Sequence, residues 1–293
     1  MAGIYIHIPF CKHKCNYCNF FSLATKRFRE EFFRALLKEI ELTRDYLGSE
    51  PVETIYFGGG TPSLFSVKLL EEIIQQIPDT GYPMPDEGRA SSIEHRVSST
   101  EHRALNIEVP EITLEMNPDD VTQEYLSKLG QSPINRISLG VQSFFDEDLS
   151  YLERMHDARQ GKRALKMILD IGCWMLDKGR GTKIENRTGA KRSSAKPKSK
   201  IVTVSVDLIY GIPTLSNDHW KENLNLVIDL GVPHISAYAL TVEPKTPLAW
   251  QIKKGIRHPV SDDQASKQFE ILMEVMDQAG YLHYEISNFC LPG

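Results

Sequence analysis

The stretch IYIHIPFCKHKCNYCNF, residues 4–20, joins a short apolar run to three cysteines that lie within eight residues. The run IYIHI has the β-rich composition of a buried strand. Cys11, Cys15 and Cys18 follow it with the spacing C-x3-C-x2-C, and Phe20 stands where a fourth cysteine could be. The stretch therefore predicts a strand that leads into a thiol-rich loop.

The rest of the chain repeats a strand-then-helix pattern. Further β-rich apolar runs occupy residues 52–57, 111–116, 134–139, 204–209 and 234–240, and a seventh strand is expected at residues 281–286. Apolar residues recur at intervals of three and four in the segments between them, residues 28–47, 67–77, 121–129, 158–172 and 219–231. This alternation predicts an α/β fold with parallel strands and right-handed crossovers, as an open sheet or a (β/α) barrel.

Composition predicts a globular protein of the cytoplasm. The chain has 293 residues, 41% of them hydrophobic, which is enough to bury the core of one large or two ordinary domains. A formal charge of -5 gives no global attraction to nucleic acid or membranes. No apolar run reaches the length of a membrane span, and the N-terminus lacks a basic region followed by an apolar one.

Two polar stretches interrupt the pattern, and both are predicted to be disordered insertions. Residues 80–106 include the tandem repeat SSIEHRV–SSTEHRA, in which a solvated loop is favoured over a metal site at His95 and His102 because no third ligand lies nearby. Residues 178–200 carry nine Lys or Arg and one Glu. This basic block could contact RNA or anionic lipid, but it lacks aromatic residues for stacking on bases, so an insertion is the preferred interpretation.

The five cysteines are poor material for a disulfide framework, because their number is odd and three are crowded together. Cys173 is interpreted as a small core residue. For the crowded three, zinc is one alternative, with His7 and His13 close by, although no second C-x-x-C pair exists in the chain. An iron-sulfur cluster is the other, since three thiolates on a four-iron cube leave one iron open for chemistry.

The cysteine spacing after a strand resembles the radical S-adenosylmethionine (SAM) superfamily. The match is strongest to the branch that contains oxygen-independent coproporphyrinogen oxidase and related heme chaperones. Further stretches resemble that branch in order along the chain: YFGGGTPS (56–63), LEMNP (114–118), NRISLGVQSF (135–144), LERMH (152–156), DLIYGIP (207–213), HISAYALTVEPKTPL (234–248) and HYEISNF (283–289). The resemblance implies a partial (β/α)6 barrel with the cluster loop after its first strand.

The resemblance also implies a set of site residues. Cys11, Cys15 and Cys18 would bind a [4Fe-4S] cluster. The glycine motif with Gly59, Gly60 and Thr61 would meet the amino group of SAM. The other residues that match SAM-binding positions of the family are Tyr5, Tyr17, Glu115, Gln142, Arg154 and Asp207.

Two features resemble the heme chaperones more than the oxidases: Phe20, where oxidases carry another cysteine, and the first strand at residue 4. The resemblance thus implies a [4Fe-4S] protein that binds SAM and heme, receives electrons from a flavodoxin or ferredoxin, and passes heme to respiratory acceptors, with peripheral membrane contact and no nucleic-acid partner. The alternatives are a coproporphyrinogen oxidase and a zinc-stabilised binding protein. Relatives continue beyond NFCLPG into a C-terminal domain, which is expected to be absent here. Possible heme ligands are His7, His13, His156 and His283.

Overall fold

The computed structural model describes residues 2–48, 50–77, 110–172 and 203–292. Both predicted insertions (residues 80–106 and 178–200) and Cys173 lie outside these described residues. In the described part, no helix is long and apolar enough to cross a membrane.

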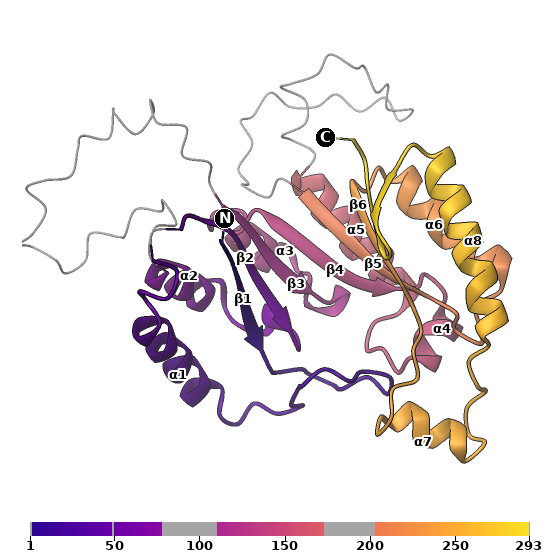
Figure 1. The fold of residues 1–293 in the computed structure, drawn as a ribbon, viewed down its shortest axis with the longest axis horizontal. Coiled ribbons are helices and arrows are strands. Elements are labelled where there is room, and N and C mark those ends of the chain that lie inside the picture. The colour runs from indigo at the N-terminus through magenta and orange to yellow at the C-terminus, as the bar shows by residue number, and fades with distance from the viewer. Residues whose placement is uncertain (1, 49, 78–109, 173–202, 293) are drawn as a thin grey trace, which may run out of the picture.

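One curved sheet organises the fold (Figure 1). Its strand order is β1-β2-β3-β4-β5-β6-β8-β7, and every pair from β1 to β6 is parallel. β1 and β7 are the two edges, so the sheet is an incomplete barrel, which confirms the predicted class. The strands are β1 (Ala2–Ile8), β2 (Val52–Gly59), β3 (Glu111–Met116), β4 (Arg136–Gln142), β5 (Thr203–Tyr210), β6 (His234–Ala239), β7 (Leu282–Glu285) and β8 (Asn288–Cys290).

Helices cover one face of this sheet. Because each parallel strand lies beside the previous one, every right-handed crossover returns on the same side. The helices are α1 (Arg29–Leu42), α2 (Val67–Gln76), α3 (Gln123–Leu129), α4 (Asp146–Tyr151), α5 (Ala158–Gly172), α6 (Asn217–Asp229), α7 (Pro247–Lys253) and α8 (Asp262–Gln278), with short 3-10 turns at Pro62–Leu64 and Pro118–Asp120. All five predicted helical segments are present, with ends shifted by up to five residues.

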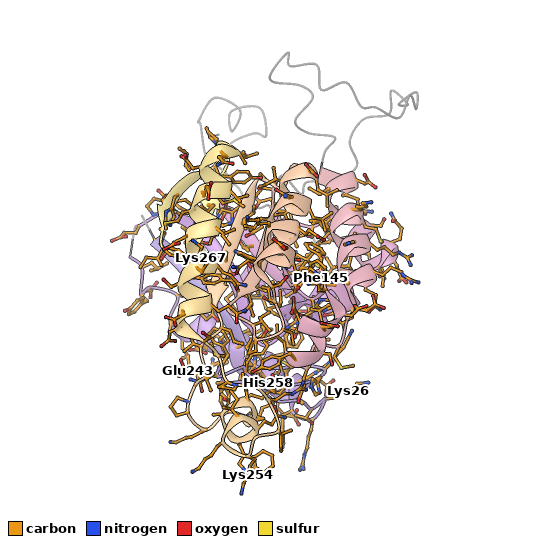
Figure 2. The ribbon with its side chains drawn as sticks, turned by 90° about the vertical axis from the view of Figure 1, so that its right-hand side faces the viewer. Lys26, Phe145, Glu243, Lys254, His258 and Lys267 are labelled. Atoms are coloured by element: carbon orange, nitrogen blue, oxygen red, sulfur yellow. The ribbon has the colours of Figure 1, made fainter. Side chains whose placement is uncertain are left out.

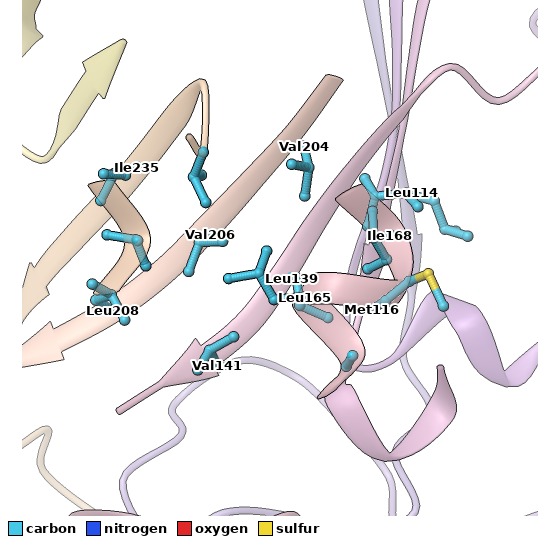
Figure 3. Close-up of a cluster of buried hydrophobic side chains, with 14 of the residues drawn as sticks. Leu114, Met116, Leu139, Val141, Leu165, Ile168, Val204, Val206, Leu208 and Ile235 are labelled. Carbon is cyan, nitrogen blue, oxygen red and sulfur yellow. The ribbon is translucent and has the colours of Figure 1, made fainter. Parts of the chain in front are cut away.

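Side-chain alternation along the strands separates an apolar face from a polar one. On β3, Ile112 and Leu114 are fully buried toward the helices, and the neighbouring strands repeat this pattern (Figure 3). Leu114 of β3 and Leu139 of β4 lie in one buried cluster with Leu165 and Ile168 of α5 (Figure 3). The alternate positions of β3, Glu111, Thr113 and Glu115, are polar and point to the concave side of the sheet.

Side-chain caps fix where several helices begin. Ser66, Thr122, Ser216, Thr246 and Ser261 each accept a hydrogen bond from the main-chain N–H three residues later. The cap at Thr246 begins α7, a short helix that contacts the cysteine loop through Leu248.

The predicted seventh strand exists as β7, but it is not a further parallel strand. It pairs antiparallel with β8, which pairs antiparallel with β6. The strand β8 was not predicted, because its three residues are too few to show periodicity.

Candidate functional site

The three cysteines lie on a loop that leaves the end of β1 and is closed by main-chain hydrogen bonds. Leu23 N donates to Pro9 O at 2.8 Å, and Cys11 N donates to Leu23 O at 3.1 Å. Cys11 is buried, Cys15 and Cys18 are half-buried, and all three are free thiols. They line one cavity together with Tyr17, Gly59, Gly60, Thr61, Asn117 and Arg154. The structure thus brings eight of the twelve predicted site residues to one cavity.

The glycine motif at the end of β2 is pressed against the start of the cysteine loop. Gly60 N donates to Ile8 O at 2.8 Å, and Thr61 N donates to Phe10 O at 2.7 Å. A Cβ atom on Gly60 would lie 2.6 Å from Phe10 O, so only glycine allows this approach. The motif therefore fixes the position of the chain just before Cys11.

Glu115 lies at the end of β3 on the concave side of the sheet. Its Oε1 accepts a hydrogen bond from Tyr56 Oη at 2.8 Å, and its Oε2 accepts one from Gly59 N at 3.1 Å. Burial raises the pKa of this carboxyl to about 7, and the nearby Asp207 also raises it, while the two hydrogen bonds act in the opposite direction. Glu115 thus joins the glycine motif to the polar face, and its charge state changes near neutral pH.

Asp207 and Gln142 lie on the same concave face, on neighbouring strands. Ser138 Oγ donates to the two carboxylate oxygens of Asp207 at 3.2 and 3.1 Å, and burial raises the pKa of that carboxyl. Gln142 ends β4 with a φ of 69°, a left-handed backbone conformation that residues other than glycine rarely adopt. Such strain is found most often at ligand sites, which is consistent with the predicted role of Gln142.

Arg154 is held in the cavity by three groups. Its guanidinium donates to Asn117 Oδ1 at 2.6 Å, to Gly140 O at 2.8 Å and to Cys15 Sγ at 3.5 Å. Its Nε is buried without a hydrogen-bond partner in the described part of the chain. A guanidinium placed in this way keeps one donor for a further group.

The two predicted tyrosines lie in different surroundings. Tyr17 lines the cavity beside Arg154, and burial raises the pKa of its hydroxyl well above the ordinary value. Tyr5 does not line the cavity; its ring lies on the concave face, stacked on Tyr56 at a centroid distance of 6.0 Å, and is 58% exposed. Tyr5, Glu115, Gln142 and Asp207 therefore form a second group beside the cavity rather than part of its wall.

Three of the four candidate heme histidines have hydrogen-bonded rings. His7 bonds with Tyr5 Oη and Phe21 O, His156 is buried and bonds with Val141 O, and His283 bonds with Ile286 O. Burial lowers the pKa of His156 to about 4. His13, exposed at the rim of the cavity, has no hydrogen bond within the described ranges. Of the four, His13 is therefore the ring that a ligand reaches at the least cost.

Asn16 anchors the cysteine loop to distant segments and was missed in the sequence. Its side chain is fully buried, and its Nδ2 donates to Tyr151 O at 2.9 Å and to Gln251 Oε1 at 3.1 Å. Its main-chain oxygen accepts from Leu248 N at 2.9 Å. Helix α7 therefore supports the cysteine loop through hydrogen bonds to Asn16. These contacts give a structural role to the end of the stretch 234–248, which resembles the family.

The turn that follows β3 forms a second support. Lys12 forms ion pairs with Asp119, at 3.0 Å, and with Asp120, and Ser63 Oγ donates to Asp120 at 2.9 Å. Asn117 Nδ2 donates to Thr61 Oγ1 at 3.0 Å, in addition to accepting from Arg154. The turn after β3 thus contacts the cysteine loop, the glycine motif and Arg154, and fixes their relative positions.

Comparison with known proteins assigns the class. The family model of the radical SAM superfamily matches residues 5–179, and the chain belongs to this superfamily. The zinc-stabilised binding protein considered above is therefore not supported.

Within the superfamily, the chain is similar in sequence to heme chaperones. The chain is similar to the heme chaperone HemW of Bacillus subtilis (strain 168), with 30% identity over 294 residues that cover 100% of this chain and 64% of the relative. It is also similar to HemW of Escherichia coli (strain K12), with 30% identity over 295 residues that cover 99% and 63% of the two chains. It spans less than two thirds of these relatives' length. In fold it resembles coproporphyrinogen III oxidase HemN of Escherichia coli, with a TM-score of 0.70, 20% identity and coverage of 99% of this chain and 55% of that one.

Proteins of this superfamily use a [4Fe-4S] cluster and SAM, and the residues of the cavity fit such a cluster. Among the described residues, no three Cys, His, Asp or Glu side chains converge as ligands of a single metal ion. A cube of four irons does not need that convergence, because each thiolate binds a different iron. Three free thiols around one cavity, with a guanidinium beside one of them, are suitable donors for three corners.

Proposed function

We propose that this chain is a radical SAM heme chaperone: it binds a [4Fe-4S] cluster and SAM, and it binds heme for transfer to acceptor proteins. The observation that carries the proposal is the similarity to HemW, which extends over the full length of this chain, including the cysteine loop, the glycine motif and α7. The reducing cytoplasm, which keeps thiols free, is the compartment that suits this site.

The proposed roles follow from the contacts of each residue. Cys11, Cys15 and Cys18 would hold three irons, and the fourth iron would supply an open position for SAM. The main chain of the glycine motif and the carboxyl of Glu115 would accept and orient the amino group of SAM, since the motif lines the cavity and Glu115 accepts a hydrogen bond from Gly59 N. Arg154, with a donor to spare, would orient its carboxylate.

Tyr17 would pack beside SAM inside the cavity, while Tyr5, Gln142 and Asp207 would contact the part of SAM that extends over the concave face. When bound, the cluster supplies an electron and SAM the group that it can cleave. The protein would exclude water and hold the cluster and SAM in place.

A coproporphyrinogen oxidase is the second candidate, because the fold resembles HemN over 99% of this chain. At 20% identity that likeness concerns the fold alone. Phe20, 67% exposed at the rim of the loop, stands where the oxidase branch carries a further cysteine. The heme chaperone is therefore preferred.

Anaerobically reconstituted protein tests the two functions in parallel. For a chaperone we expect heme to remain with the protein through gel filtration and to move to an apo-acceptor such as apomyoglobin, with no decarboxylated product from coproporphyrinogen. Loss of all heme on the column contradicts the proposal. Product formed with SAM and reductant supports the oxidase instead.

A further inference from the structure

Two segments near the cysteine loop of this acidic protein carry several basic residues and no acidic ones. Residues 1–29 contain five Lys or Arg and residues 244–261 contain four, and neither segment has an Asp or a Glu. The chain has 34 Lys and Arg against 39 Asp and Glu, so the remaining residues hold 25 basic side chains against 39 acidic ones. Apart from the basic stretch at residues 178–200, which lies outside the described residues, these two segments are basic blocks about two hundred residues apart in sequence.

The fold brings these two blocks together around the cysteine loop. The first block contains the loop, and the second contains α7, which contacts it through Asn16, Leu248 and Gln251. Figure 2 shows Lys26, Lys254 and His258 at the same end of the molecule. We call this end the basic face and define it by its exposed cations, Lys14, Lys26, Arg27, Lys245, Lys253 and Lys254.

The charge of the basic face is not neutralised by its neighbours. Lys12 is paired with Asp119 and Asp120, and Arg257 lies 3.7 Å from Glu153, so these two cations are not counted in the face. None of the six defining cations has a carboxylate within ion-pair distance in the described part of the chain. Glu243 is the acidic side chain beside them, and it contacts Asn19 instead, at 3.5 Å.

Exposed apolar side chains stand among these cations. Trp250 and Ile256, both from the second block, are 57% and 60% exposed. A large aromatic residue surrounded by a charged rim is the composition of a protein–protein interface. The basic face therefore has both the long-range attraction and the apolar anchor that docking requires.

We infer that the basic face is the docking site of an acidic one-electron carrier protein. The inference rests on the proposed function, because a cluster held by Cys11, Cys15 and Cys18 must receive an electron from outside. The carrier loses one electron and the cluster gains it; no bond forms and no proton moves. Lys14 belongs to the cysteine loop and α7 contacts that loop through Asn16, so a carrier bound to the basic face lies beside the segment that holds the cluster ligands.

The test measures how fast reduced flavodoxin, an acidic carrier, reduces the reconstituted cluster in a stopped-flow instrument. The triple variant Lys26→Glu/Lys253→Glu/Lys254→Glu reverses three charges of the face without touching the cysteine loop's ligands. The control triple variant, Lys68→Glu/Lys166→Glu/Lys221→Glu, makes the same change in net charge on exposed positions of α2, α5 and α6. Iron content and the final extent of reduction by excess dithionite are recorded for each protein.

We expect the bimolecular rate of the first variant to fall at least about tenfold at low salt, and that of the control to change less than about twofold. The wild-type rate should fall as ionic strength rises from about 0.05 to 0.5 M, and the first variant should lose most of this dependence.

The outcomes separate this inference from the proposed function. Normal iron content with an unchanged rate in the first variant overturns the inference alone. Charge-dependent binding to phosphatidylglycerol vesicles, with no effect on the carrier rate, also overturns it and assigns the face to a membrane. A protein that holds no cluster contradicts the proposed function, and the inference falls with it.

Discussion

Replacing Gly60 by alanine is the substitution whose effect the structure predicts most directly. A Cβ atom there would lie 2.6 Å from Phe10 O and 2.9 Å from both Ile8 O and Phe10 C. Ordinary contacts of a Cβ atom begin at 3.4 Å. The glycine motif and the start of the cysteine loop would therefore have to separate by roughly 0.8 Å, and both sides are main chain, which cannot rotate away.

That separation acts on two short hydrogen bonds. Gly60 N–Ile8 O and Thr61 N–Phe10 O, at 2.8 and 2.7 Å, would both lengthen. Overpacking costs about 1–3 kcal/mol and each weakened hydrogen bond up to about 1 kcal/mol, so we expect a loss of about 3 kcal/mol in the free energy of unfolding. Because Phe10 precedes Cys11, we also expect less iron to be retained after reconstitution.

Gly161→Ala is the matched control. Its added Cβ would lie 3.3 Å from Val141 Cγ1, a side-chain atom that can adjust, and alanine is favoured over glycine inside α5 by about 0.5–1 kcal/mol. Urea unfolding followed by circular dichroism gives both free energies, provided that the two m-values agree. If Gly60→Ala lost no more stability than Gly161→Ala, the close approach of the glycine motif to the loop would be refuted.

Three further predictions concern the supports of the site. Asn16→Ala leaves Tyr151 O and Gln251 Oε1 without their hydrogen-bond donor. We expect the free energy of unfolding to fall by about 2 kcal/mol and the cluster to be lost faster. An unchanged half-life of the cluster would contradict the supporting role of α7. Lys12→Met keeps the stem but removes the ion pairs, so cluster loss should become faster and depend less on salt, which iron release measured at two ionic strengths would show. Burial raises the pKa of Glu115 from 4.5 to about 7, so the native carboxyl takes up a proton that the unfolded chain releases, and its contribution to stability is lost as pH rises from about 4.5 to 7. The free energy of unfolding of wild type minus that of Glu115→Gln should therefore fall by about 3 kcal/mol across this range and stay level above it, and a rising difference would refute the assignment.

The fold was predictable because its signals are local. Strand runs and helical periods repeat in order, and sequential parallel strands with right-handed crossovers leave few arrangements open. The hairpin of β7 and β8 was only half predicted, because the direction of a short terminal strand depends on its partner and not on its own sequence. Helix ends were displaced where a polar cap, such as Thr122, begins the helix later than the apolar pattern suggests.

The site was only partly predictable, because its supports join residues that are far apart in the chain. Nothing in the sequence near Asn16 indicates a partner at Gln251, 235 positions away. Asn117 lies in LEMNP (114–118), a stretch that resembles the family. Its contact with Arg154 nevertheless forms only when the end of β3 and the loop after α4 come together in the fold. Long-range pairing of this kind leaves no local pattern in the sequence, because it exists only once the chain has folded.

The central claim is that three thiolates hold a four-iron cluster with one iron open to SAM. The most direct measurement is paramagnetic resonance of the anaerobically reconstituted and reduced protein, with and without SAM, for wild type and Cys15→Ala. We expect a reduced [4Fe-4S] signal that changes when SAM is added and is absent from the variant. A wild-type protein that forms no cluster, or whose signal is indifferent to SAM, would contradict it.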